Sequence, residues 1–219
     1  MKKCIALAVV MTLLCSCALA ETLDISGKES TLNMNQSRAI QVELTDDAAF
    51  AAKNMDAVER EGDIYSVHAG NVTYHLDVGP FPTFLCFTQD LYASFDAYLR
   101  HGSPKELQKM LIDEDIHFFL YDLETELTIY IYSDEADELS ALAEDFSSLS
   151  PANQELIASI LCTDPVLKQA GNTTWILGND HLMATIVGGE YVIVEFGGSD
   201  DPAADLEDTL ALLSHLQFE

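Results

Sequence analysis

Histidine is the residue in this chain best suited to binding a metal or moving a proton, and its six copies are scattered. They are His68, His75, His101, His117, His181 and His215. None forms a His-x-His pair or the H-E-x-x-H arrangement that places two ligands on one helix face. His68 and His75 flank a predicted hairpin turn, where two neighbouring surface imidazoles are the favoured interpretation. We therefore predict no metal site, and no cofactor.

The serine after two glycines, Ser199, has the setting of a nucleophile turn between a strand and a helix. The G-x-S-x-G pattern of such turns is missing, and Asp200 and Asp201 follow at once. These carboxylates also oppose phosphate binding, so a loop cap is the favoured role of Ser199. We predict no catalytic residue in the chain.

The cysteines Cys86 and Cys162 both lie in apolar surroundings. In an exported protein such a pair is compatible with a disulfide, and equally with two buried free thiols. A catalytic thiol needs an electropositive neighbourhood, which this acidic chain scarcely supplies.

Three acidic clusters offer carboxylates for calcium, but none has the ligand spacing or central glycine of an EF-hand. Two of them stand at predicted helix starts, where acids stabilise the helix dipole without an ion. We therefore predict no specific calcium site. The clusters are Asp113-Glu114-Asp115, Asp134-Glu135-x-Asp137-Glu138 and Asp200-Asp201.

Aromatic residues on the predicted strands could line a ligand groove, although core positions with a satisfied polar tip are the favoured interpretation. A lined cavity beside them would favour a carrier of a small molecule or ion. The residues are Trp175, Tyr121, Tyr130 and Tyr132.

The net charge excludes one class of partner. The chain has 37 acidic and 10 basic side chains, giving a formal net charge of −27 at pH 7. Such a charge repels the phosphate backbone and anionic lipid surfaces, so nucleic acid is not an expected partner. The main consequence is a solvated, acidic surface.

The N-terminus has the three parts of an export signal. Two lysines precede an apolar run from Cys4 to Ala20, which ends in Ala18-Leu19-Ala20. We predict cleavage before Glu21, which leaves a secreted chain with a net charge of −29, because Lys2 and Lys3 are lost and no acid is. A retained membrane anchor is the weaker alternative, so we expect no transmembrane segment after cleavage. Another alternative is lipid anchoring at Cys17, within Leu14-Cys15-Ser16-Cys17.

The rest of the chain predicts one domain. We assign residues 1–20 to the signal peptide, 21–36 to a polar lead-in and 37–219 to a single domain. The predicted strands are 39–44, 64–68, 72–78, 83–88, 116–123, 127–133, 174–177, 182–187 and 190–196. The predicted helices are 46–60, 90–100, 104–111, 134–149, 150–161 and one starting at Asp201-Pro202.

Several predicted strands are apolar on both faces. Ile129 and Ile131 face one way while Tyr130 and Tyr132 face the other. Such strands are normally covered on both sides, and the hairpins make the sheet mainly antiparallel. The sequence therefore predicts an α+β fold with helices on both faces, an α/β/α sandwich.

The order of these elements resembles the PsbP-like fold of photosystem II extrinsic subunits and bacterial DcrB-type envelope proteins. The segments TYHLDVGPFPTFLCFTQD, YDLETELTIYIYSDE and EYVIVEFGG are also similar to secreted proteins of unknown function from anaerobic Gram-positive bacteria. The resemblance covers about residues 60–219 and implies a non-enzymatic accessory protein. It transfers no functional residue, because no family motif is matched.

We therefore expect a secreted or surface-associated bacterial accessory protein, which binds an unknown protein or cell-envelope component. The alternatives are a carrier of a small molecule or divalent ion, and a hydrolase with a dispersed site. A pocket that gathers a histidine with a carboxylate would favour the hydrolase.

Overall fold

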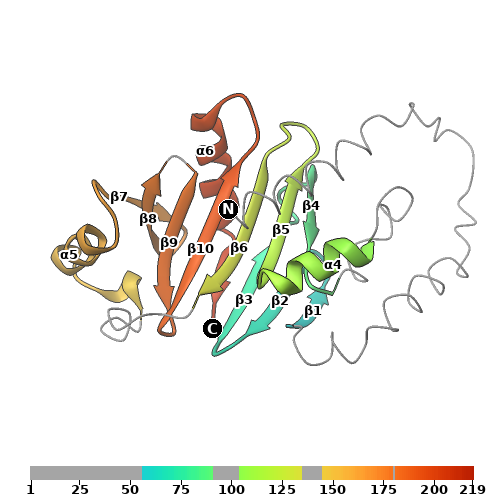
Figure 1. Ribbon diagram of the computed structural model, residues 1–219, viewed down its shortest axis with the longest axis horizontal. Coiled ribbons are helices and arrows are strands. Elements are labelled where there is room, and N and C mark those ends of the chain that lie inside the picture. Colours follow the sequence, from blue (N-terminus) through green and yellow to red (C-terminus); the bar gives the residue numbers. More distant parts are fainter. Residues whose placement is uncertain (1–55, 91–103, 135–144, 180) are drawn as a thin grey trace, which may run out of the picture.

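The computed structural model describes residues 56–90, 104–134, 145–179 and 181–219 (Figure 1). The signal peptide, the polar lead-in and the predicted strand at 39–44 lie outside these residues. So do residues 91–100 of the predicted helix at 90–100 and most of the one at 134–149.

The described residues form two antiparallel sheets. The four-stranded sheet has the order β1-β2-β3-β11, and the seven-stranded sheet has the order β4-β5-β6-β10-β9-β8-β7. The strands are β1 (Ala57–Glu61), β2 (Ile64–Ala69), β3 (Val72–Asp77), β4 (Phe84–Phe87), β5 (Ile116–Asp122), β6 (Thr128–Asp134), β7 (Val166–Ala170), β8 (Thr173–Asn179), β9 (Leu182–Val187), β10 (Glu190–Gly197) and β11 (Leu216–Phe218).

Three α-helices and one 3-10 turn accompany the sheets in the described part of the chain. They are α4 (Pro104–Asp113), η3 (Phe146–Ser148), α5 (Pro151–Leu161) and α6 (Pro202–Leu213). Helix α6 begins where the sequence predicts, because the Asp201 carboxylate accepts hydrogen bonds from the Ala203 and Ala204 N–H groups. In Figure 1, α4 and α5 lie toward opposite ends of the seven-stranded sheet.

The inner core lies between the two sheets. Strands β5, β6 and β10 contribute side chains such as Phe118, Ile131 and Val194, which meet Tyr74 of β3 and Leu212 of α6. All five are fully buried. The inner face of the large sheet is therefore covered by the smaller sheet together with α6.

The outer face of the large sheet is covered by helices. Under α4, Leu111 packs with Phe119, Tyr130 and Tyr132. Under α5, Ala158 packs with Ile176, Ile186 and the 3-10 residue Phe146.

The structure confirms the α+β class, the mainly antiparallel sheet and the burial of its central strands on both faces. The prediction of helical layers alone is incomplete, because a second sheet shares the cover of the inner face. The short strands β7 and β11 were not predicted.

Two helix predictions were wrong within the described residues. Residues 57–60, assigned to a helix, form edge strand β1, which pairs with β2 in the register Arg60↔Tyr65. Residues 145–149, assigned to the end of a helix, form a bridge from Asp145 to Val187 and the turn η3. Pairing with β2 in the first place, and with Val187 of β9 in the second, outweighs a local preference for helix.

Candidate functional site

A pocket of about 520 Å³ opens at one end of the two sheets, where strand β11 of the smaller sheet lies near the β7–β8 turn of the larger one. Its floor and walls come from the β7–β8 turn, the end of β9, the turn η3 and strand β11. The polar lining residues are Asp145, Ser147, Asn172, Thr173, Ser214 and Gln217, and the apolar ones include Val187, Leu216 and Phe218.

Local hydrogen bonds fix the acidic side of this pocket. The Asp145 carboxylate accepts from the backbone N–H of Ser147 at 2.9 Å, and the Ser147 hydroxyl accepts from the backbone N–H of Thr174 at 2.9 Å. Among the described residues, the side-chain amides of Asn172 and Gln217 have no hydrogen-bond partner. Both amides can therefore bind a ligand without losing an interaction within the protein.

The backbone of the β7–β8 turn brings the wall close to the end of α6. Gly171 has φ of +57°, and a Cβ atom there would lie 2.8 Å from the carbonyl oxygen of Ser214. Only glycine meets both the positive φ and the close approach.

Trp175 lies next to Phe218, one of the residues that line the pocket. It is fully buried, and its ring centroid is 6.4 Å from that of the lining residue Phe218. Its indole N–H has no hydrogen-bond partner among the described residues. Trp175 thus adjoins a residue that lines the pocket, whereas Tyr130 and Tyr132 belong to the core under α4.

A second polar cluster surrounds His117, which sequence reasoning missed as a site residue. His117 is fully buried at the bulge where β5 shifts its register against β6. Its Nδ1 lies 2.7 Å from Asp56 Oδ2, and its Nε2 lies 2.9 Å from Ser133 Oγ. The imidazole therefore joins the start of β1 to the end of β6.

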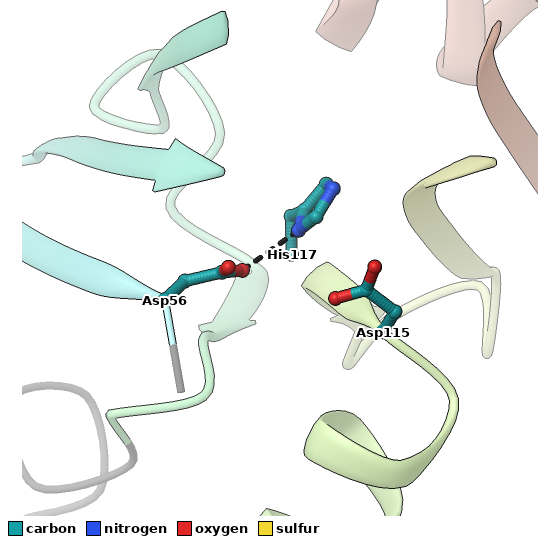
Figure 2. Close-up of side chains that lie close together, drawn as sticks. All are labelled: Asp56, Asp115 and His117. Carbon is teal, nitrogen blue, oxygen red and sulfur yellow. Dashed lines mark hydrogen bonds and ion pairs between the residues drawn. The ribbon is translucent and has the colours of Figure 1, made fainter. Parts of the chain in front are cut away.

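The second acidic residue of this cluster is Asp115. Asp115, Asp56 and His117 each offer a ligand atom within 4.8 Å of the other two (Figure 2). Asp115 has φ of +52° in the turn between α4 and β5 and is exposed. Desolvation raises the pKa of its carboxyl group, and the charge of Asp56 adds to the rise, while His117 lowers it.

Gln89 holds this cluster together. Its Oε1 accepts a 2.7 Å hydrogen bond from the Asp56 N–H, and its Nε2 donates to the carbonyl oxygens of Leu111 and Ile116. Gln89 is fully buried, so it ties the chain before β1 to the segment that carries Asp115 and His117.

The side-chain contacts from Ser133 to His117 and from His117 to Asp56 connect these residues in the way that a nucleophile, a base and an orienting acid are connected. Such a relay needs the substrate carbonyl next to the serine and the imidazole Nε2. Here the Tyr74 ring lies 4.8 Å from the imidazole ring, and both residues are fully buried. The burial favours a structural connection over acyl transfer.

The other histidines of the described chain stand apart. His68 Nδ1 lies 3.1 Å from Thr73 Oγ1, and His75 Nδ1 lies 2.8 Å from Ser66 Oγ. The predicted surface pair therefore consists of two imidazoles with separate partners. His181 meets Phe196 edge to face, and His215 meets Phe81 in the same way, while His101 lies outside the described residues.

The cysteines and Ser199 have structural roles. Cys86 is buried in the inner core and Cys162 packs at the outer face, so both are free thiols. Ser199 donates to the buried carboxylate of Asp205 and accepts from the Asp201 N–H, as a loop cap does.

No family model, curated protein or solved structure matches this chain. Among the described residues, no helix is both long and apolar enough to cross a membrane.

Proposed function

We propose that the chain is an exported, non-enzymatic binding protein that carries a small polar molecule in the pocket between its sheets. The pocket of about 520 Å³ carries this proposal, since its volume suits a small ligand. The amides of Asn172 and Gln217 supply donors and acceptors, and the Phe218 ring supplies an apolar wall.

The charge of the pocket narrows the ligand class. The Asp145 carboxylate lines it, and the chain as a whole has a net charge of −27. A neutral or cationic ligand with several hydroxyl or amino groups is therefore favoured over an anion.

The proposal also includes secretion of the chain and a PsbP-like fold. The lysine-led apolar start and Ala18-Leu19-Ala20 support secretion, with lipid anchoring at Cys17 as the alternative. A PsbP-like origin, with an α/β/α sandwich at its centre, is supported by the order of strands, helices and the C-terminal helix α6.

Trp175 makes the test direct, because it is the only tryptophan in the chain. We would screen amino acids, amino sugars and monosaccharides by thermal shift, and titrate each hit while recording Trp175 fluorescence. At least one compound should raise the melting temperature and change the fluorescence with a saturable curve.

Variants then locate the binding. Asn172→Ala with Gln217→Ala should weaken binding at least tenfold, because both amides line the pocket. Asn153→Ala, which changes an exposed amide on α5, is the matched control and should leave binding unchanged. The proposal is wrong if no compound changes either signal, or if the double variant binds as tightly as the native chain.

A second candidate is a protein partner, favoured by an apolar surface on α5. Leu156 and Ile160 lie one turn apart on α5 and are 59% and 52% exposed. Glu155 precedes Leu156 in the chain and Asp164 follows Ile160 by four residues, so the surface suits an apolar groove edged by basic residues.

Two variants that change similarly exposed apolar residues, on α5 and elsewhere, test this surface. Leu156→Ser with Ile160→Ser should abolish crosslinking to one discrete partner in native envelope extract. Leu123→Ser changes a residue that is 52% exposed elsewhere, and the crosslink should persist. Equal crosslinking by both variants would remove this candidate.

A further inference from the structure

The cluster around His117 has a feature that a structural connection does not require. Asp56 Oδ2 and His117 Nδ1 are already hydrogen-bonded to each other at 2.7 Å, yet the Asp115 carboxylate also lies close to both. In Figure 2 the Asp56 and Asp115 carboxylates lie on either side of the imidazole. Two carboxylates this close repel each other unless a positive charge lies between them.

We propose that Asp56, Asp115 and His117 bind a divalent transition-metal ion. This site is separate from the pocket between the sheets and does not depend on the function proposed for it. Carboxylate oxygen and imidazole nitrogen are ligands of Zn²⁺ and similar ions, and three protein ligands leave a position for water.

The outer contact of His117 suits a metal on Nδ1. An imidazole that binds a metal through Nδ1 carries its proton on Nε2, and that proton needs an acceptor. Ser133 Oγ lies 2.9 Å from Nε2 and can accept it. Ser133 is thus a positioning residue, which fixes the tautomer and the orientation of the ring.

Coordination requires only a small movement. Two ligands of a tetrahedral Zn²⁺, each about 2.0 Å from the ion, lie about 3.3 Å apart. The Asp56–His117 pair, now at 2.7 Å, must therefore open slightly, and Asp115 must move inward from within 4.8 Å. Asp115 is exposed in a turn, so its carboxylate can make this movement.

The surroundings limit both access and flexibility. The His117 side chain is 1% exposed and that of Asp56 is 12% exposed, so an ion enters past Asp115. Gln89 accepts a hydrogen bond from the Asp56 N–H and donates to the carbonyl oxygens of Leu111 and Ile116. These hydrogen bonds fix the backbone on both sides of the site.

The Tyr74 hydroxyl is a further buried polar group beside this cluster. It is buried and has no hydrogen-bond partner among the described residues. The Tyr74 ring lies 4.8 Å from the His117 ring, so this hydroxyl belongs to the same buried region.

The nature of the ligands predicts the ion class. Ca²⁺ prefers six to eight oxygen ligands, and Mg²⁺ keeps most of its water, so a buried imidazole offers neither an advantage. Zn²⁺ and Mn²⁺ both accept mixed nitrogen and oxygen ligands. We therefore expect Zn²⁺ to bind more tightly than Ca²⁺.

Calorimetric titration of the chelator-treated full chain with Zn²⁺ tests the proposal. We expect one saturable site per chain, which Mn²⁺ occupies and millimolar Ca²⁺ does not block. Asp115→Asn should weaken Zn²⁺ binding at least tenfold. It leaves the Asp56–His117–Ser133 connection intact, so the variant should fold as the native chain does, which circular dichroism checks.

Glu114→Gln is the matched control, since it removes one exposed charge from the adjacent residue of the same turn. It should leave Zn²⁺ affinity within twofold, which separates the site from general attraction to an acidic surface. Ser133→Ala should weaken binding by about tenfold, as expected for an outer hydrogen-bond partner. The absence of a saturable Zn²⁺ site, or equal losses in the Asp115 and Glu114 variants, would overturn the proposal.

Discussion

The hydroxyl group of Tyr132 donates a 2.6 Å hydrogen bond to Glu195 Oε1 on the neighbouring strand. Two residues earlier on the same face of β6, the Tyr130 hydroxyl is buried and has no partner among the described residues. Burial raises the pKa of both phenols, and the hydrogen bond to Glu195 adds to the rise for Tyr132. The two tyrosines are therefore alike in burial and differ in hydrogen bonding.

This difference predicts opposite outcomes for the same substitution. Tyr132→Phe should lower the free energy of unfolding by about 1–2 kcal/mol, because it removes a hydrogen bond to a charged, half-buried acceptor. Tyr130→Phe should be neutral or slightly stabilising, because it removes a buried hydroxyl without a partner in the described structure. Urea denaturation of the two variants and the native chain measures both values. Equal losses would contradict the hydrogen-bond assignment.

The hairpins were predictable because their turn residues and apolar strands agree. Gly70 has φ of +56°, and Gly188 and Gly189 have φ of +60° and +82°, as the two predicted turns require. The sequence also places α5 correctly, starting at Pro151. In these segments, local preference and tertiary pairing select the same structure.

The missed features depend on contacts between distant segments. Strand β11 is only three residues long and forms by pairing with β3, Phe218 opposite Tyr74. The His117 cluster unites residues from three segments, and Asp56 is 61 positions from His117. One signal was present: a single histidine interrupts the apolar run from Ile116 to Leu120, where a buried imidazole needs polar partners.

The two thiols should differ in reactivity. Burial raises the pKa of Cys86, and burial followed by the charge of Asp164 raises the pKa of Cys162. Cys162 is half-buried and Cys86 is buried. Iodoacetamide at pH 8.5 should therefore modify Cys162 slowly in the native chain, and Cys86 only after denaturation. Peptide mass spectrometry reads each site separately, and a peptide pair linked by a disulfide would contradict the structure.

Asp122 should make stability depend on pH. Desolvation opposes ionisation of this buried carboxyl group, but hydrogen bonds from Thr125, Thr83 and the backbone of Glu124 and Thr125 outweigh it and lower its pKa. A lowered pKa stabilises the fold above the unfolded value of about 4, and the contribution is lost as pH falls through the folded value.

Asp122→Asn removes this contribution. The variant should be less stable than the native chain by about 2 kcal/mol at pH 7, because one amide group then faces the donors. The difference should shrink as the pH falls below about 4, because the unfolded carboxyl group takes up a proton there and the native one follows at its lower pKa. Urea denaturation at pH 7, 5 and 3 measures it. A difference that stays constant over this range would show that the charge of Asp122 has no role.

Two glycines with similar positive φ separate the cost of that φ from the cost of crowding. Gly62 has φ of +64°, and a Cβ atom there would have no neighbour within 4 Å, whereas a Cβ atom at Gly171 would lie 2.8 Å from the Ser214 carbonyl oxygen. Gly62→Ala should cost about 1 kcal/mol, the penalty of a side chain at positive φ. Gly171→Ala should cost at least about 1 kcal/mol more, because the backbone of the turn or of the α6 end must move.

The same two variants should also differ in ligand binding. Since Gly171 and Ser214 both line the pocket, binding should weaken in Gly171→Ala and stay unchanged in Gly62→Ala. Thermal denaturation and the Trp175 fluorescence titration measure the two effects, and equal destabilisation of the variants would place the β7–β8 turn farther from α6 than the structure does.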